Sequence, residues 1–165
     1  MGVTQLRLVS FRIVILLILS FKSVTQLILI YFRSIKQLIL ISFKSVTQLT
    51  LIYFRSVPYL ILSFRSVTQL ILISFNSVKQ LMLISFKSVT QLILISFSSV
   101  KQLILIYFKS VTQLILTSFK IVTQFILSFR SVKQLILSLR SVSQLILISF
   151  KSVTQLTLIS FRSEP

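Results

Sequence analysis

Apolar and polar positions follow one short pattern along the whole chain, Ser-Phe-Lys/Arg-Ser-Val-Thr-Gln-Leu-Ile-Leu-Ile, as residues 85–95 show it. Phenylalanine marks the period from Phe11 to Phe161, with Leu139 in place of one Phe. Most steps between these markers cover the full unit, and four steps are one position shorter because the last Ile of the unit is missing. The pattern predicts a single low-complexity array of 10- or 11-residue repeats over residues 1–165, without separate domains.

Residue types within the repeat favour strands over helices. Val, Ile, Thr, Phe and Tyr are frequent and Ala is absent, which is typical of β-structure. The segment from Val to the next Phe is about nine residues long, a plausible length for a strand. The sequence therefore predicts an all-β fold of short strands, and two repeats together have the length of a solenoid coil.

An odd period conflicts with one continuous strand, because side chains alternate between the two faces of a strand and each repeat would exchange them. A break near Lys/Arg-Ser in every repeat resolves the conflict. The break has to form almost without the Gly, Asn and Asp residues that tight turns prefer, since Pro58 and Asn76 are isolated exceptions. A chain without a unique fold remains an alternative.

Apolar helices associated with a membrane are the other alternative. One full repeat makes three helical turns, but the apolar residues spread around such a helix instead of forming a stripe. The longest stretches without Lys or Arg, 66–78 and 88–100, are shorter than the roughly 18–20 apolar residues that a span needs. The cost of one central basic residue is close to the gain from the surrounding apolar ones, so insertion is near break-even.

The first repeats are the best single candidate for a signal or an anchor. Arg7 and Arg12 precede the apolar run at 13–19, and Lys22 follows it, as in the charged and apolar parts of a signal peptide. No small-residue cleavage pattern follows. The alternative is a divergent first repeat, in which Leu16 occupies the position of the recurring Gln.

Composition excludes most site chemistry. The chain has no His and no Cys, and its only acidic residue is Glu164, next to the last residue. General acid–base catalysis, zinc and iron–sulfur sites and carboxylate cages for Ca²⁺ or Mg²⁺ lack their ligands. Ser and Lys recur everywhere, so no pair stands out as a nucleophilic site. We expect no enzyme activity, no catalytic, cofactor-binding or metal-binding residue, and no cofactor.

Basic residues give the chain a formal net charge of +17, and 13 of 15 repeats carry Lys or Arg after the Phe position. Asn76 and Ser98 are the exceptions, and in both repeats a Lys follows three residues later, Lys79 and Lys101. Basic and aromatic residues together suit single-stranded nucleic acid, which we do not favour, and basic residues alone suit an anionic lipid membrane. Basic residues also limit aggregation of the Leu-Ile-Leu-Ile segments. These segments are of the kind that form cross-β assemblies, so another copy of the chain is the remaining candidate partner.

Differences between repeats point to an origin. Thr50, Thr117 and Thr157 replace apolar residues and Ile121 replaces Ser, which indicates weak selection on packing if these positions are in a core. All the common exchanges are single-base changes. The leading hypothesis is an open reading frame translated from a 33-base tandem repeat, with no specific biochemical function. The alternatives are a cationic, hydrophobic, membrane-associated repeat protein and a self-associating β-repeat with a structural role.

Overall fold

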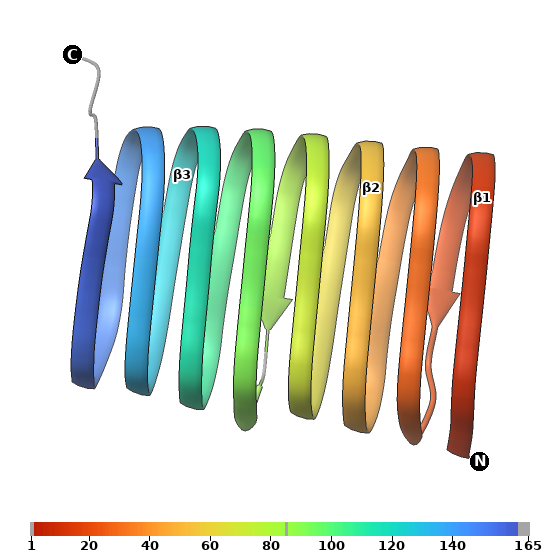
Figure 1. Cartoon of the computed structure of the whole chain (residues 1–165), viewed down its shortest axis with the longest axis horizontal. Helices are drawn as coiled ribbons and strands as arrows, with labels where there is room; N and C mark the ends of the chain where they lie inside the picture. The colour runs from red at the N-terminus through yellow and green to blue at the C-terminus, as the bar shows by residue number, and fades with distance from the viewer. Residues whose placement is uncertain (1, 85, 162–165) are drawn as a thin grey trace.

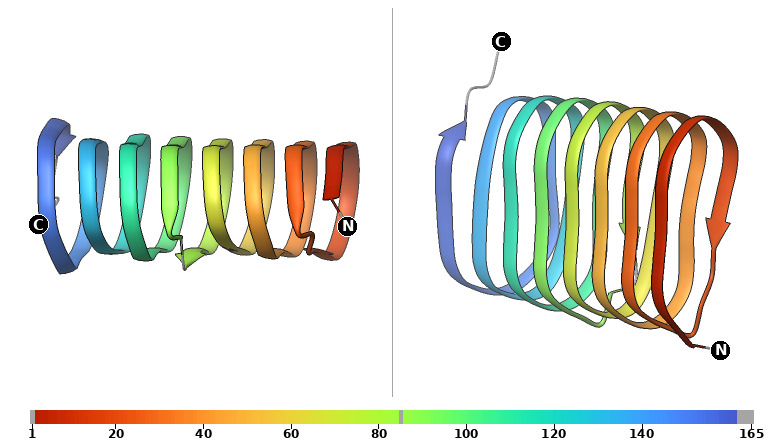
Figure 2. Two further views of the ribbon diagram at one scale, coloured as in Figure 1. Left: turned by 90° about the horizontal axis from the view of Figure 1, so that it is seen from below. Right: turned by 45° about the vertical axis from the view of Figure 1, so that its right-hand side comes forward.

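The chain winds into a β-solenoid of about seven turns (Figures 1 and 2). The computed structural model describes residues 2–84 and 86–161, without the side chains of residues 3, 42, 149, 150, 160 and 161. The strands β1 (Gly2–Leu19), β2 (Ser23–Ile84) and β3 (Ser88–Phe161) form one parallel sheet in the order β1-β2-β3. The predicted all-β fold and the solenoid are confirmed.

The described residues contain no helix, and so none that is long and apolar enough to cross a membrane. The apolar helices considered as an alternative are therefore wrong for this structure. The apolar segment 13–19 belongs to β1, which pairs in register with β2, so that Leu16 lies beside Gln37. The first repeat is thus a divergent copy of the others within the same sheet.

Two repeats make one coil. Gln5 pairs with Gln26, and Gln69 pairs with Gln91, so that a position of one repeat lies beside the same position two repeats later. Equivalent residues of every second repeat therefore lie on top of one another, and we call such a stack a column. Neighbouring strands of a sheet lie about 4.8 Å apart, which sets the spacing along each column.

The core consists of four inward positions in each repeat, as Val89, Leu92, Leu94 and Phe97 illustrate. These positions are buried throughout residues 24–142, and their only departures from Val, Leu, Leu and Phe are Ile35, Phe125 and Leu139. Two outward residues follow each Phe and each Val, at Lys/Arg-Ser and at Thr-Gln. These pairs make corners, which restore the facing that an odd period would otherwise reverse.

A left-handed residue absorbs the difference between long and short repeats. Ser or Tyr before the Phe position has φ between 52° and 59° in the long repeats, at Ser10, Tyr31, Tyr53, Ser74, Ser96, Tyr107 and Ser118. Ser63, Ser128 and Ser138, in the short repeats, have no such φ. In a short repeat, Leu62 and Phe64 face inward with one residue between them, so the strand needs no bulge.

This difference predicts opposite effects of one substitution at two equivalent serines. Ser96→Gly should stabilise the fold by up to about 1 kcal/mol, because Gly adopts positive φ without steric strain. Ser63→Gly should destabilise it by about 0.5–1 kcal/mol, because Gly in an extended strand loses more conformational entropy. Denaturant unfolding of both variants measures the two signs, and equal signs would contradict the bulge.

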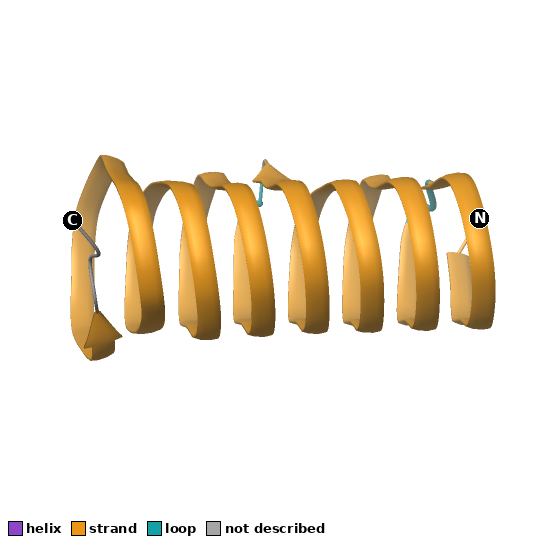
Figure 3. Ribbon diagram, turned by 90° about the horizontal axis from the view of Figure 1, so that it is seen from above, coloured by secondary structure: helices purple, strands orange, loops and turns teal. Residues whose placement is uncertain are grey.

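The ribbon continues through most corners, unlike the expected break in every repeat. Among the described residues, only 20–22 and 86–87 lie outside the strands, and both separations lie at a Phe-Lys step (Figure 3). Elsewhere the outward pairs turn the chain while it remains paired to the next coil. At the two separations themselves the coils stay connected, because the backbone N–H of Lys44 donates to the carbonyl of Lys22 at 2.9 Å and that of Lys87 donates to the carbonyl of Arg65 at 3.0 Å.

Each coil has two rounded sides and two flatter faces between them (Figure 2). Side A carries the segments that begin at Phe11, Phe32, Phe54, Phe75, Phe97, Phe119 and Leu139. Side B carries those that begin at Phe21, Phe43, Phe64, Phe86, Phe108 and Phe129, and both separations of the strands lie on it, along the lower edge of Figure 1.

The sequence suggests weak selection on packing from the threonines at apolar positions. The structure removes the support for that suggestion, because Thr50, Thr117 and Thr157 are not in the core. Thr50 and Thr117 are half-buried and Thr157 is exposed, all at the outward Ile positions of the flat faces. Ile121 is 53% exposed at a corner. A hydroxyl at such a position keeps access to water, so the expected penalty of a buried unpartnered hydroxyl does not arise. Substitutions are frequent at outward positions and rare at inward ones.

Candidate functional site

Side B carries an uninterrupted column of cations. It contains one exposed Lys or Arg in every coil, namely Lys22, Lys44, Arg65, Lys87, Lys109, Arg130 and Lys151. All seven occupy equivalent positions of successive coils, so the stacking of the coils fixes the spacing of the charges. From the first cation to the last, the column extends for about 29 Å, six steps of about 4.8 Å.

Side A also has a basic residue in each of its coils, but these residues do not form one column. Its post-Phe column reads Arg12, Arg33, Arg55, Asn76, Ser98, Lys120 and Arg140. In the two coils that lack a cation there, Lys79 and Lys101 stand three residues later on the same side, and both are exposed. The structure thus places the substitutions and the lysines that accompany them in the same coils. Side A therefore carries a cation in every coil, but in the two middle coils the cation lies three residues further along the chain.

Glutamine ladders run along both junctions between a rounded side and a flat face. In one ladder each side-chain Nε2 donates to the Oε1 of the next coil from Gln26 to Gln134, at 2.9–3.0 Å. The other runs from Gln80 to Gln144 at 2.6–3.0 Å, and Tyr59 occupies the column before it. Amide ladders satisfy these half-buried polar groups and hold the coils in register. Gln26 Oε1 is buried and has no hydrogen-bond partner.

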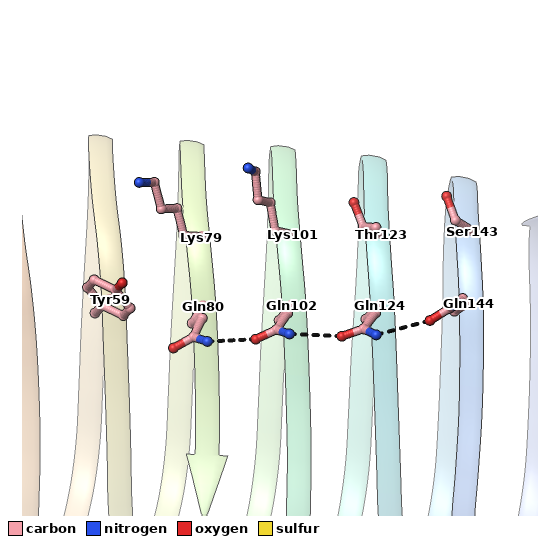
Figure 4. A pocket seen from close by; sticks show the side chains of 9 residues that line it. All are labelled: Tyr59, Lys79, Gln80, Lys101, Gln102, Thr123, Gln124, Ser143 and Gln144. Carbon is pink, nitrogen blue, oxygen red and sulfur yellow. Dashed lines mark hydrogen bonds between the residues drawn. The ribbon is translucent and has the colours of Figure 1, made fainter.

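Beside the second ladder lies an open hollow of about 590 Å³ (Figure 4). Figure 4 shows Lys79 and Lys101 above the amides of Gln80 and Gln102, with Tyr59 at one end. Thr123 and Ser143 continue the lysine positions, with Gln124 and Gln144 beneath them. The hollow combines two cations with amide and hydroxyl groups, and these can hold an anion but not perform acid–base chemistry at neutral pH.

Phenylalanine forms two columns inside the solenoid. Along side A the rings of Phe75, Phe97 and Phe119 stack in parallel, with centroids 4.9 and 4.7 Å apart. From Phe32 to Phe129 every ring of both columns is at most 2% exposed. Binding of single-stranded nucleic acid through alternating Phe and Lys/Arg would require exposed rings for base stacking. Burial removes that stacking surface, because the Phe side chains complete the core.

The first and the last described coils leave core positions exposed. At the C-terminal end a hollow of about 450 Å³ is lined entirely by apolar side chains of the last coils, among them Leu127, Leu137, Leu147 and Leu158. Leu147 and Leu158 are each 56% exposed although they belong to inward columns. At the N-terminal end Phe11 stacks on Phe32 at 5.2 Å and is 41% exposed. Sequence patterning could not indicate these surfaces, because their residues are the same types that are buried in the middle.

Among residues 2–84 and 86–161, no group of three or more metal-ligating side chains comes together. Glu164, the only acidic residue of the chain, lies outside the described residues. No family model matches this chain, and it is significantly similar neither to a curated protein nor to a solved structure.

Proposed function

We propose that this chain is a self-associating structural repeat protein rather than an enzyme, and that copies stack end to end. The observation that carries the proposal is the exposure of core leucines and phenylalanine at the first and last described coils. Natural repeat proteins keep their terminal repeats soluble with polar caps, and such a cap is missing from the coils that the structure describes. The outer edges of the first and last described coils also present backbone N–H and C=O groups with no neighbouring strand to pair with.

The two ends are complementary in register. Leu19 of the first coil and Leu147 of the last belong to the same inward column, as do Leu8 and Leu158. Because the last described coil ends on side A, at Phe161, and the first begins on side B, at Gly2, a second copy follows without a gap when it is turned by half a turn about the solenoid axis. Leu8 of the added copy then lies on Leu147 and Leu19 lies on Leu158, so each inward column continues with the residue type that it already contains. Burying the exposed half of one such leucine contributes about 1 kcal/mol, in addition to the backbone hydrogen bonds of the joined strands. The contact is head to tail, which produces a filament.

Charge opposes this stacking. Arg12 of the added copy would follow Lys151 of the other, so the row of cations continues across the junction. Like charges at this spacing repel each other by about 1 kcal/mol per pair in water, and salt screens that repulsion. Assembly is accordingly expected to increase with ionic strength.

A matched pair of substitutions tests the end-to-end contact. Leu147→Lys places a charge at the open core end, whereas Ile148→Lys places it on the outer face of the same coil, and the two side chains are 56% and 62% exposed. Leu147→Lys should abolish filaments at protein concentrations where wild type forms them, and Ile148→Lys should leave them. Sedimentation velocity and negative-stain electron microscopy at 0.5 M salt provide the measurement.

Circular dichroism confirms that both variants keep their β-structure. End-to-end stacking would be contradicted if both variants formed filaments or if neither variant did. A monomeric wild type at 0.5 M salt would contradict self-association itself.

The other two hypotheses stay predictions. Translation of a 33-base tandem repeat without selected function predicts no constraint at the level of codons, although the concentration of substitutions on the outside favours a chain selected to fold. Synonymous-site statistics across the DNA repeats test it. Membrane association predicts a carbonate-resistant membrane pellet from cell lysate, whereas a self-associating β-repeat predicts a detergent-insoluble pellet.

A further inference from the structure

The cation column of side B, from Lys22 to Lys151, has no counter-charge among the described residues. All seven side chains are exposed, and the only acidic residue of the chain, Glu164, lies outside the described residues. Neighbouring charges lie on adjacent strands, about 4.8 Å apart at the backbone. Seven aligned charges of one sign collect mobile counterions, which a linear anion releases when it binds.

Hydroxyl groups accompany the column along its length. A serine follows each cation, at residues 23, 45, 66, 88, 110, 131 and 152. Two of these serines, Ser131 and Ser152, hydrogen-bond to each other through their Oγ atoms at 3.2 Å, so the serine column also continues from coil to coil. Ammonium, guanidinium and hydroxyl groups are the side chains that donate hydrogen bonds to phosphate oxygens.

A hollow of about 410 Å³ lies on this side between the last coils. Lys109, Arg130 and Lys151 line it together with Ser128 and Tyr107. Three consecutive cations of the column thus face one open space that can admit a chain of anionic groups. Tyr107 is 71% exposed and is the single exposed aromatic ring beside the column among the described residues.

We propose that side B binds a linear polyphosphate chain along the solenoid axis. The row of cations on side B matches the row of negative charges along a polyphosphate chain. A globular acidic partner would not present its charges in such a row. The buried Phe columns leave no platform for bases, which favours a phosphate chain without bases over single-stranded nucleic acid. The cations form one line on a rounded side, whereas a lipid surface would engage charges spread over a plane. The proposal does not depend on self-association, because all seven cations belong to one chain.

Two triple variants with the same net charge provide the test. Lys87→Gln, Lys109→Gln and Arg130→Gln remove three consecutive cations from the side B column. Arg12→Gln, Arg33→Gln and Arg55→Gln remove three exposed cations from consecutive coils of side A, outside the hollow beside Lys79 and Lys101. Binding of labelled polyphosphate of at least ten phosphates is measured by fluorescence anisotropy between 50 and 300 mM salt, with the Leu147→Lys background used to keep the protein unassembled.

The side B variant should bind at least about tenfold more weakly at 150 mM salt. Its slope of log K against log salt should change from about −5 to about −3, since each phosphate contact contributes about −0.7. The side A variant should stay within about threefold of the parent. Equal weakening of both variants would show that only net charge matters and would overturn the proposal.

Competitors distinguish other ligands. Tripolyphosphate should compete poorly because it covers only a fraction of the column, and equal competition per molecule would contradict binding along the axis. Tighter binding of oligo-dT than of polyphosphate with the same number of phosphates would assign the column to nucleic acid. Binding to vesicles of anionic lipid without binding to polyphosphate would assign it to membranes. Failure of the filament test with intact polyphosphate binding would leave this proposal standing.

Discussion

Leu103→Asp is expected to destabilise the solenoid by more than about 4 kcal/mol, while Ile104→Asp, one residue further along the same strand, changes stability by about 1 kcal/mol or less. Leu103 is completely buried between Leu81 and Phe125 of the adjacent coils, and the described core contains no buried polar side chain that could pair with a carboxylate. Ile104 faces outward and is half-buried. Its column already contains Met82, and the outer faces accept Thr50.

Guanidinium unfolding followed by circular dichroism measures both changes, with the transition midpoint as the readout. The pair tests which face of the strand is inside, because hydrophobicity alone predicts equal effects for two aliphatic neighbours. Equal destabilisation by the two substitutions would contradict the assignment of Leu to the inside and Ile to the outside. A collapsed state without fixed facing would give that result.

Phe97→Ala is expected to destabilise the middle of the array by about 3–5 kcal/mol. The ring is fully buried and stacks between Phe75 and Phe119, so its removal leaves a cavity that closely packed neighbours cannot fill. Each stacked pair contributes a further 0.5–1.5 kcal/mol or so. Phe97→Leu should have a much smaller effect, since Leu139 already occupies this column and is 1% exposed.

Phe11→Ala is the matched control for that prediction. Phe11 belongs to the same column but stacks on one side only and is 41% exposed, so its removal should change stability by about 1–2 kcal/mol. Because each coil contacts only its neighbours, the change at Phe11 should be confined to fraying of the first coil. Hydrogen exchange resolved by peptide separates the two patterns. Equal, global effects of both substitutions would contradict coil-by-coil stability.

The proposed end-to-end assembly depends on charge. A row of cations would continue across the proposed junction, where like charges repel each other. A linear anion bound along side B would neutralise that repulsion and bridge two copies. Polyphosphate should therefore lower the salt concentration at which wild type forms filaments, an effect that the side B variant should lack.

Much of this arrangement follows from the order of the residues. Val, Ile and Phe in alternation specify strands, and the short period specifies that equivalent residues stack, because identical repeats gain the same contacts in every copy. The expectation of no acid–base chemistry also rests on composition alone, since the chain has no His, no Cys and a single acidic residue. The expected break of the strand at every Lys/Arg-Ser step is found at only two of these steps. At the others, pairs of outward residues and one left-handed Ser or Tyr turn the chain without interrupting its pairing.

Tertiary structure decides what the repeat leaves open. Equivalent residues would lie beside each other whether adjacent repeats or every second repeat stacked, so the sequence does not distinguish the two arrangements. In the structure every second repeat stacks, and Lys87 therefore lies beside Arg65 and not beside Asn76. A coil of two repeats forms because inward Leu and Phe need two facing layers about 10 Å apart, which a single repeat is too short to enclose. That geometry assigns Ile to the outside and Leu to the core, and it gathers one unbroken row of cations on side B. It also leaves identical leucines buried in the middle and exposed at the ends, because burial depends on a neighbouring coil.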